Sequence, residues 1–484
     1  MSLKKVPFVL TTVFLVLLCL IGILMLTLLQ PIFYPLFHRA IVYETQLVNG
    51  SEVYQQWAKP TIPIYIEFYL FNLTNPASFL SGGKPVVNQI GPYTYREQRS
   101  KVDIVENNTA GTLSYREIKQ HFFEPTMSTG TESDVVTTVN LVYLSVARKI
   151  DWLPAPILRI IEELEAKSGD MVITSRNVSE LLWGYEDPFL RFFPPFSHTF
   201  GLFVGRNNSL GGTVVIDTGK ENEVHVGQII SVDGRSSLSC WTTKEANQIN
   251  GSDGSLFHPF LKPNETVYVF ASDLCRSFEF KPHEEDTFLG VPVVRYLPSE
   301  DSFDSPANSS KNRGFCLHPP KCYKDGVLDG STCIPDSPIV FSMPHLVHAD
   351  PSYTDAVLGL HPSAEFNTTF LVEQSTGAVL SVSKKIQINA VVEKNSKLKG
   401  LRSVSNVLLP VMFLNESAQA DEQIARSLRL LLSLPLVYTT VGALLLVVPA
   451  FAIIALVSIY VRRERQLDLE PSPTQPLLSE PIVA

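Results

Sequence analysis

Two long uncharged segments, one near each end of the chain, constrain the fold more than any other feature. Val6–Leu29 and Leu436–Val461 contain no charged residue, and each exceeds the roughly 20 apolar residues that a helix needs to cross a bilayer core. A cleaved signal peptide would have a shorter apolar region followed by small residues, whereas Gln30-Pro31 follows the first segment. We therefore expect two membrane helices.

Basic residues beside both segments predict the topology. Lys4 and Lys5 precede the first segment, and Arg462, Arg463 and Arg465 follow the second. Because basic flanks stay in the cytosol, we expect both termini there. The predicted organisation is a cytosolic N-terminus (1–5), a membrane helix (6–29), a lumenal or extracellular domain (30–435), a second membrane helix (436–461) and a cytosolic tail (462–484).

The segment between the anchors is rich in glycosylation sequons. Chance would give about three or four N-x-S/T motifs in a chain of this composition. The ten that occur begin at Asn49, Asn72, Asn107, Asn177, Asn207, Asn250, Asn264, Asn308, Asn367 and Asn415. The excess predicts a heavily glycosylated domain in the secretory pathway.

The composition and the motif inventory argue against two other classes of function. The formal net charge is −9, so no basic excess is present to neutralise the phosphates of a nucleic acid. Serine-hydrolase, zinc-protease, P-loop and dinucleotide motifs do not occur, so we expect no enzyme, no cofactor and no metal. Paired carboxylates for glycoside hydrolysis have no sequence signature, and that alternative stays open. The ten histidines fit either a response to acidic pH or ordinary structural roles.

Strand signals dominate the region between the anchors. Alternating or continuously apolar runs rich in β-branched and aromatic residues predict strands at Ile62–Phe71, Val214–Ile216, Ile229–Val232, Thr266–Ala271, Val293–Tyr296, Lys384–Val392 and Val407–Leu414. Within Lys384–Val392 the alternation of apolar and polar residues predicts a half-buried strand. Helical periodicity appears at Pro156–Lys167 and Ala420–Leu432. We expect a large mixed β domain with a helical subregion near residues 140–190.

Five cysteines lie between the anchors, whereas Cys19 lies inside the first one. Four of the five fall between residues 275 and 333, so disulfides are expected in an oxidising compartment. Their spacing lacks the close pairs of a structural zinc site, and it does not choose among the three pairings of four cysteines.

Several strings resemble the class B scavenger receptor family, most closely its lysosomal member. They are WAKPTIPIYIEFYLFNLTNP (57–76), GPYTYRE (91–97), ELLWGYEDP (180–188), INGSDG (249–254), FHPF (257–260), FASDLCRS (270–277), GFC (314–316) and LPVMFLNES (409–417). The resemblance runs from anchor to anchor. It implies an α+β ectodomain, built on an antiparallel β-barrel with an apical helical bundle, and an apolar tunnel toward the membrane. It also implies lipid or lipoprotein ligands and, for the lysosomal member, a lysosomal hydrolase as cargo.

The resemblance also carries residue assignments. It implies disulfides between Cys275 and Cys333 and between Cys316 and Cys322. A third bridge of some members is absent, because its positions are Ala246 and Gly314, and we expect Cys240 to be a free, buried thiol. The apical helix supplies the ligand-binding candidates, whose apolar stripe could equally be ordinary core packing. These candidates are Lys149, Ile157, Leu158, Ile161 and Leu164.

The C-terminal tail holds a candidate sorting signal. QPLLSE (475–480) resembles an acidic dileucine motif built on Leu477 and Leu478, although Pro473 stands where an acid is usual. Such a motif would bind a cytosolic adaptor complex. The sequence thus predicts a lysosomal or late endosomal membrane glycoprotein that conducts lipid through its ectodomain. The alternatives are a sorting receptor for a lysosomal hydrolase and a plasma-membrane lipoprotein receptor.

Overall fold

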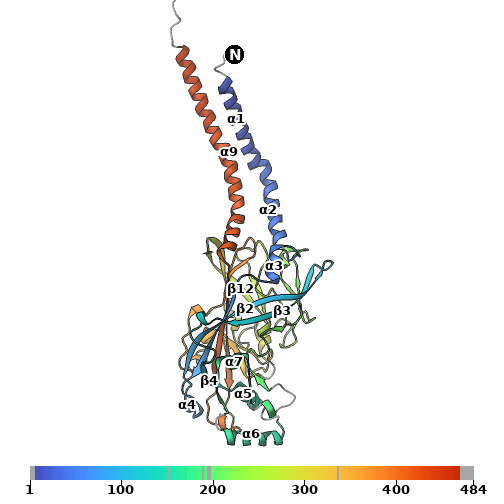
Figure 1. The fold of residues 1–484 in the computed structure, drawn as a ribbon, viewed down its shortest axis with the longest axis vertical. Coiled ribbons are helices and arrows are strands. Elements are labelled where there is room, and N and C mark those ends of the chain that lie inside the picture. Colours follow the sequence, from blue (N-terminus) through green and yellow to red (C-terminus); the bar gives the residue numbers. More distant parts are fainter. Residues whose placement is uncertain are drawn as a thin grey trace, which may run out of the picture. The chain divides into compact units, whose positions relative to one another are not determined.

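The computed structural model describes residues 6–149, 153–168, 171–187, 190–192, 198–334 and 337–468. It divides into two compact units. The first unit combines Met1–Ala40 with Arg426–Ala484, and the second is Ile41–Ala425. Figure 1 shows the terminal helices of the first unit in blue and red.

The first unit consists of long apolar helices. The N-terminal one comprises α1 (Val6–Ile23), the π-helical turn η1 (Leu24–Leu29) and α2 (Gln30–Thr45), and the C-terminal one is α9 (Glu422–Asp468). Their segments Phe8–Thr45 and Glu422–Gln466 are long and apolar enough to cross a membrane. Both helices extend beyond the segments expected from hydrophobicity. The helix predicted at Ala420–Leu432 merges with α9, which continues through Pro435 into the apolar segment.

Within the first unit, the two helices contact each other through small and aromatic residues. A Cβ on Gly22 would lie 2.6 Å from Leu446 N and 2.8 Å from Gly442 O. The Tyr438 hydroxyl donates to Met25 O at 2.8 Å, and the Tyr438 ring stacks on Phe33 with centroids 4.2 Å apart. Close backbone approach at glycine is typical of helix pairs in membranes.

The second unit is built on one large antiparallel sheet. Its strands follow the order β10 (Ile229–Val232), β9 (Val214–Asp217), β3 (Thr112–Phe123), β2 (Val87–Asn107), β1 (Ile64–Leu73), β18 (Val407–Gln419), β17 (Val379–Val392), β16 (Thr369–Val372), β13 (Val291–Pro298), β12 (Arg276–Phe288) and β11 (Val267–Ala271). The short strands β8 (Ser209–Leu210), β14 (Val327–Asp329) and β15 (Ile339–Ser342) join it at β3 and β17. The structure thus contains each predicted strand, with shifted ends: β1 begins after Pro63, which has no N–H for the ladder.

The INGSDG segment nearly closes this sheet into a barrel. The Ile229 N–H at the β10 edge donates to Gly251 O at 2.8 Å. At the β11 edge, Ser252 N–H donates to Tyr268 O, and Phe270 N–H donates to Ser252 O. A Cβ on Gly251, whose φ is +83°, would lie 1.9 Å from Tyr268 O, so this close approach requires glycine. The antiparallel barrel implied by the resemblance is therefore confirmed.

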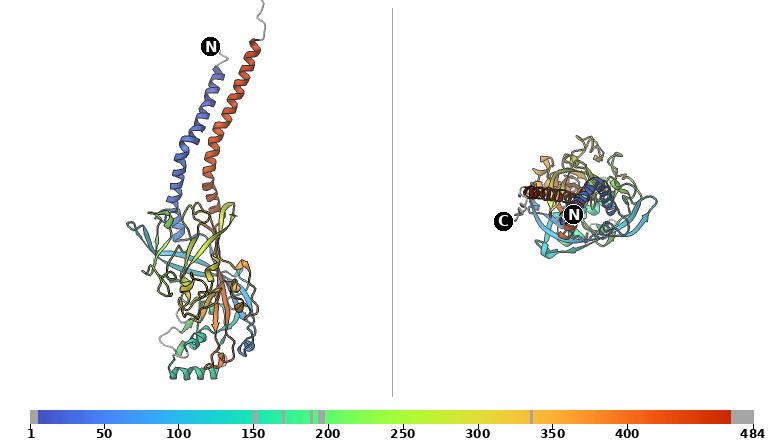
Figure 2. Two further views of the ribbon diagram at one scale, coloured as in Figure 1. Left: turned by 180° about the vertical axis from the view of Figure 1, so that it is seen from behind. Right: turned by 90° about the horizontal axis from the view of Figure 1, so that it is seen from above.

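Short helices and two small two-stranded sheets complete the second unit. The helices are α3 (Glu52–Ala58), α4 (Pro76–Leu80), α5 (Leu141–Arg148), α6 (Ala155–Ser168), α7 (Val178–Trp183) and α8 (Pro351–Thr354). The two-stranded sheets pair β4 (Val135–Val139) with β5 (Ile173–Asn177), and β6 (Tyr185–Glu186) with β7 (Thr199–Phe200). Helices α5 and α6 lie at the end of the unit opposite α3 in both side views (Figures 1 and 2), so the expected helical subregion is present.

The structure corrects the half-buried strand predicted at Lys384–Val392. Gln387 and Asn389 in β17, expected to face solvent, are completely buried. Segment 342–346 covers them: the His345 N–H donates to Gln387 Oε1 at 2.7 Å, and Asn389 Nδ2 donates to Ser342 Oγ at 2.9 Å. Because these hydrogen bonds satisfy the buried amides, two polar residues occupy a core face that the alternation alone assigns to solvent.

Candidate functional site

Strand β2 carries a run of alternating residues that point to the barrel interior. Tyr93 and Tyr95 are buried there, and Glu97, Arg99 and Lys101 continue the same face with the two-residue period of a strand. The register places Lys119 opposite Arg99 and Glu416 opposite Ile66, a core residue of β1. We define the charged layer by the residues that meet on this face, which are Glu97, Arg99, Lys101, Glu117, Lys119, His121, Asp253, Lys384 and Glu416.

Ion pairs link this layer across four strands. Arg99 pairs with Glu97 beside it and reaches past β1 to Glu416 Oε1 on β18, with Nη2 at 3.4 Å. The Glu416 carboxylate also lies 3.6 Å from Lys384 Nζ on β17. At the other end, His121 Nε2 on β3 lies 3.1 Å from Glu97 Oε2. The layer therefore forms one continuous network rather than separate surface pairs.

The electrostatics of the layer keep Glu97 and Glu416 ionised. Burial by itself raises the pKa of Glu97, but the attraction of Arg99 and a hydrogen bond from His121 outweigh it and lower the pKa to about 2. The pKa of Glu416 is lowered in the same way, against burial, by Lys384 and Arg99. Opposite charges nearby thus stabilise the charged carboxylates.

Lys101 ties the layer to α3. Its ammonium donates to Trp57 O at 2.9 Å and lies 4.9 Å from the Trp57 ring centroid and 5.4 Å from that of Tyr115. Burial lowers the pKa of Lys101, and the charges of Asp253 and Glu117 oppose that effect. Cation–π and hydrogen-bond contacts together hold this buried ammonium.

An aromatic cluster adjoins the charged layer inside the barrel. Tyr95 packs edge-on against Phe68 and Trp183, with centroids 5.6 and 5.1 Å apart. Phe203 lies 5.0 Å from Phe68, and His121 of the charged layer lies 5.1 Å from Trp183. Apolar and charged side chains therefore adjoin each other within the barrel.

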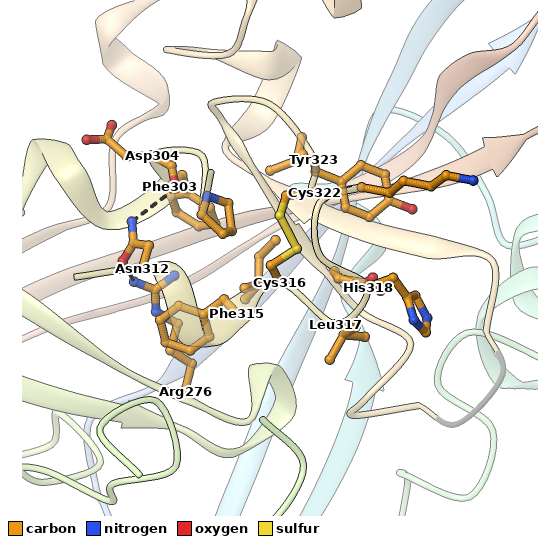
Figure 3. Close-up of a pocket in the computed structure, with 15 residues that line it drawn as sticks. Arg276, Phe303, Asp304, Asn312, Phe315, Cys316, Leu317, His318, Cys322 and Tyr323 are labelled. Atoms are coloured by element: carbon orange, nitrogen blue, oxygen red, sulfur yellow. Dashed lines mark hydrogen bonds between the residues drawn. A yellow bond between two sulfur atoms is a disulfide. The ribbon is translucent and has the colours of Figure 1, made fainter. Parts of the chain in front are cut away.

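Two surface cavities lie outside the barrel interior. A groove of about 380 Å³ runs along the closure between β10 and β11, where His258 Nε2 lies 3.0 Å from Glu265 Oε1. A second cavity, of about 20 Å³, lies beside the Cys316–Cys322 disulfide (Figure 3). It has room for about one water molecule and none for a lipid.

The small cavity belongs to a structural cluster around Arg276. The guanidinium lies 3.9 Å from the Phe315 ring centroid, and Nη2 donates to Asn312 Oδ1 at 3.0 Å. Burial lowers the pKa of Arg276 to about 9, against the attraction of Asp301. Figure 3 shows Asn312 between Arg276 and the Phe303–Asp304 segment. Asn312 Nδ2 donates a hydrogen bond to Asp304 O at 3.0 Å. The cluster anchors the cysteine-rich loop to β12.

The structure contains the disulfides Cys275–Cys333 and Cys316–Cys322, the pairs that the resemblance implies. Cys240 is unpaired and partly buried, and burial raises the pKa of its thiol. Ala246 and Gly314 lie together, since a Cβ on Gly314 would be 2.6 Å from Ala246 Cβ.

The apolar residues of α6 pack inward. Ile161 is buried in the main hydrophobic core, and Ile157, Leu158 and Leu164 pack against that core, so direct ligand contact through this stripe would require the helix to move. Lys149, which follows α5, is exposed. The outward face of α6 carries the exposed Arg159 and Glu163.

The sequons differ in accessibility. Six of the asparagines are exposed, namely Asn49, Asn107, Asn207, Asn250, Asn264 and Asn308. Asn72, Asn177, Asn367 and Asn415 are half-buried. Asn415 is held most firmly, because Nδ2 donates to Glu67 at 2.9 Å while Oδ1 accepts from Ser383 at 2.7 Å.

Leu477 and Leu478 lie outside the described residues. Within the part of the chain that the structure describes, no group of three or more His, Cys, Asp or Glu side chains is placed to hold a metal ion.

The charged layer itself was missed by the sequence analysis. A signal was present in the sequence. Alternate positions of one strand are occupied by Tyr93, Tyr95, Glu97, Arg99 and Lys101, so their side chains share one face. Because Tyr93 and Tyr95 on this face are aromatic and suited to a core, the three charged side chains are predicted to face inward with them. Only the partner strands tell whether such charges are compensated.

A large antiparallel barrel between terminal helices that can each cross a membrane defines a double-anchored membrane protein. The family model of the CD36 family matches residues 13–460, and the chain belongs to this family. It is 36% identical over 413 residues to lysosome membrane protein 2 of Mus musculus and of Homo sapiens, covering 84% of this chain and 85% of each relative. It is 32% identical over 390 residues to scavenger receptor class B member 1 of Rattus norvegicus, covering 79% of this chain and 76% of that relative. The chain is thus a membrane protein of the scavenger receptor type, and these relatives are named as a membrane protein and a receptor.

Proposed function

We propose that this protein is a lipid-binding receptor of lysosomal and late endosomal membranes that conducts lipid through its barrel toward the bilayer. The observation that carries the proposal is the barrel interior, where the charged layer adjoins an aromatic cluster of Phe68, Tyr95, Trp183 and Phe203. Moving a lipid through water exposes its chain at about 0.8 kcal/mol per CH₂. A barrel interior lined by aromatic and charged side chains lowers this free-energy cost of lipid transfer, and the transfer needs no chemical step.

The membrane topology completes the proposal. Residues 6–29 and 436–461 cross the bilayer, residues 30–435 face the lumen, and residues 1–5 and 462–484 face the cytosol. The two terminal helices are long and apolar enough for this arrangement, and their basic flanks favour it.

Occluding the barrel tests the conduit. Ala418 is opposite Ile64 and Val382 and therefore faces the interior. Ala418→Trp should abolish uptake of a fluorescent lipid by cells that express the full-length protein at wild-type levels. Ser417→Trp, on the opposite face of the same strand, is the matched control and should leave uptake unchanged. Equal uptake in both variants would refute the conduit.

The lysosomal location rests on one relative's name and on the tail residues Leu477 and Leu478. Replacing both leucines by alanine should move the full-length protein from lysosomes to the cell surface, because an adaptor complex would no longer bind the tail. A wild-type protein that already resides at the surface would favour the plasma-membrane alternative, which agrees with the scavenger receptor relative.

A second function, delivery of a lysosomal hydrolase, is favoured by the orientation of α6. Its apolar stripe packs into the core, which leaves Arg159 and Glu163 exposed for a protein partner. Glu163→Lys should abolish hydrolase delivery while leaving lipid uptake intact. The reverse result would exclude this helix as the cargo surface.

A further inference from the structure

Several members of the charged layer face the barrel interior and yet have accessible surface. The exposed fraction of the side chain is 35% for Lys119, 30% for Lys384, and 21% for both Glu117 and Glu416. Glu117 lies opposite the buried Lys101 and Glu416 opposite the buried Ile66, while Lys119 and Lys384 share the faces of these two acids, which places this surface inside the barrel. Space for water-sized molecules therefore lies beside charged groups of both signs.

The accessible lysines are held loosely by their acidic neighbours. Lys119 Nζ lies 3.5 Å from Glu117 Oε1, and Lys384 Nζ lies 3.6 Å from Glu416 Oε1. Both distances exceed the 2.7–3.2 Å that is usual for N–H···O hydrogen bonds. Lys384 Nζ also donates to Asp253 O at 3.2 Å. Because an ammonium has three donors, each lysine can still donate to an additional polar partner.

His121 supplies an independent indication of a missing partner. Its side chain is almost completely buried and its Nε2 contacts Glu97. Its Nδ1 is buried without a hydrogen-bond partner among the residues that the structure describes. A buried polar atom in this condition costs roughly 1–3 kcal/mol, and a polar guest in the layer would remove that cost.

The charge balance of the layer selects the guest. The acids Glu97, Glu117, Asp253 and Glu416 equal in number the bases Arg99, Lys101, Lys119 and Lys384. A guest with net charge would leave an uncompensated charge in a poorly solvated interior, which is strongly unfavourable. A zwitterion adds no net charge and offers a partner to each sign.

We propose that the charged layer is a binding site for the zwitterionic headgroup of a phospholipid, and this inference rests on the lipid-binding function proposed above. The anionic phosphate lies toward Lys119 and Lys384, and the cationic group toward Glu117 and Glu416. The acyl chain packs against the aromatic cluster, which His121 adjoins through Trp183.

Headgroup preference tests the proposal in the full-length protein in detergent micelles. The probes share one acyl chain: lysophosphatidylcholine is zwitterionic, and lysophosphatidylglycerol and the free fatty acid are anionic. The wild type should bind lysophosphatidylcholine about tenfold more tightly than either anion. Lys119→Met should weaken that binding about tenfold, since a charge-assisted hydrogen bond contributes about one such factor.

The opposite charge change gives the sharper result. Glu117→Gln leaves the layer with one excess positive charge and should reverse the preference toward the anionic lipids. Lys119→Arg keeps the charge and should bind like the wild type. Lys311→Met is the matched control, because Lys311 pairs with Glu279 and Asp301 outside the layer, and it should also bind like the wild type.

Other outcomes would contradict either the headgroup site or the lipid function on which it rests. Equal binding of the three probes by the wild type, or equal effects of Lys119→Met and Lys311→Met, would overturn the headgroup site and leave the lipid function standing. Binding of no probe at all would overturn the lipid function. Competition by free glycerophosphocholine as strong as by the lysolipid would assign the site to a soluble headgroup instead. Should Lys119→Met fail to fold, the preference of Glu117→Gln decides alone.

Discussion

His121 Nε2 lies 3.1 Å from Glu97 Oε2 inside the barrel, and both side chains are almost completely buried. The contact joins β3 to β2 at the point where the aromatic cluster meets the charged layer. Because Arg99 contacts the same carboxylate, Glu97 links His121 to the rest of the network.

Glu97→Gln should lower the free energy of unfolding at pH 7 by about 3 kcal/mol, because it removes the carboxylate that Arg99 contacts most closely and leaves the guanidinium only the more distant Glu416 and Glu117. The folded pKa of Glu97 is about 2, below the roughly 4.3 of an unfolded chain. Its stabilisation is therefore complete above pH 4.3 and is lost as the pH falls through 2. Denaturant unfolding between pH 7 and 2 should show wild type and variant converging.

The control for Glu97 is Glu284→Gln, at a largely exposed carboxylate paired with Arg295. This change should cost less than about 1 kcal/mol, as exposed ion pairs do. Equal losses for the two variants would contradict a special role for the interior network.

His345 should make stability fall in mild acid. His345 Nε2 lies 2.6 Å from Gln89 Oε1, and His345 Nδ1 accepts a hydrogen bond from the backbone N–H of His361 at 3.1 Å. Burial and the charge of His361 lower the pKa of His345 to about 4, against about 6.5 when unfolded. The unfolded chain binds the proton first, so about 2 kcal/mol should be lost between pH 6.5 and 5.

His345→Asn should remove this slope, since asparagine tolerates the φ of 55° at this position. His225→Asn, at a half-exposed histidine, should keep it. Thermal unfolding from pH 7.5 to 4 measures both, and an unchanged slope in the His345 variant would assign the pH dependence elsewhere.

Gly251→Ala should prevent closure of the barrel. The added Cβ would lie 1.9 Å from Tyr268 O at a φ of +83°, so the variant should lose at least about 3 kcal/mol and stay in the endoplasmic reticulum. Gly234→Ala adds a Cβ at a similar φ of +75° with nothing within 4 Å, and it should cost about 1 kcal/mol. The measurement is the acquisition of complex glycans, which requires folding and exit from the endoplasmic reticulum. Similar retention of both variants would mean that the positive φ, and not the contact with Tyr268, causes the folding defect.

Gly22→Leu should separate the terminal helices, because Leu446 and Gly442 leave no room for a side chain there. Cysteines introduced by Phe33→Cys and Tyr438→Cys, where the rings stack 4.2 Å apart, should crosslink in membranes of a Cys19→Ser background. Adding Gly22→Leu should abolish the crosslink, whereas adding Leu20→Phe, at an exposed position, should preserve it. A crosslink that persists with Gly22→Leu would refute this contact.

Local sequence was sufficient for the elements that depend on a single segment. The terminal helices follow from uninterrupted apolar runs, and strands such as β10 and β18 follow from short apolar runs that contain β-branched residues. The motif INGSDG identified the family, but its role in closing the barrel was not readable, because Gly251 meets Tyr268 only through the fold.

The charged layer shows what the tertiary structure alone decides. Glu97 lies two residues from Arg99 on β2, whereas Glu416 is far away in the sequence, and only the register of β2, β1 and β18 brings Glu416 to Arg99. The same holds for Gln387 and Asn389, whose burial depends on a segment packed over β17. Sequence periodicity determines which side chains share a face, because it reflects the geometry of one strand. Whether that face meets solvent, an apolar core or compensating charges depends on long-range pairing, which no local pattern encodes.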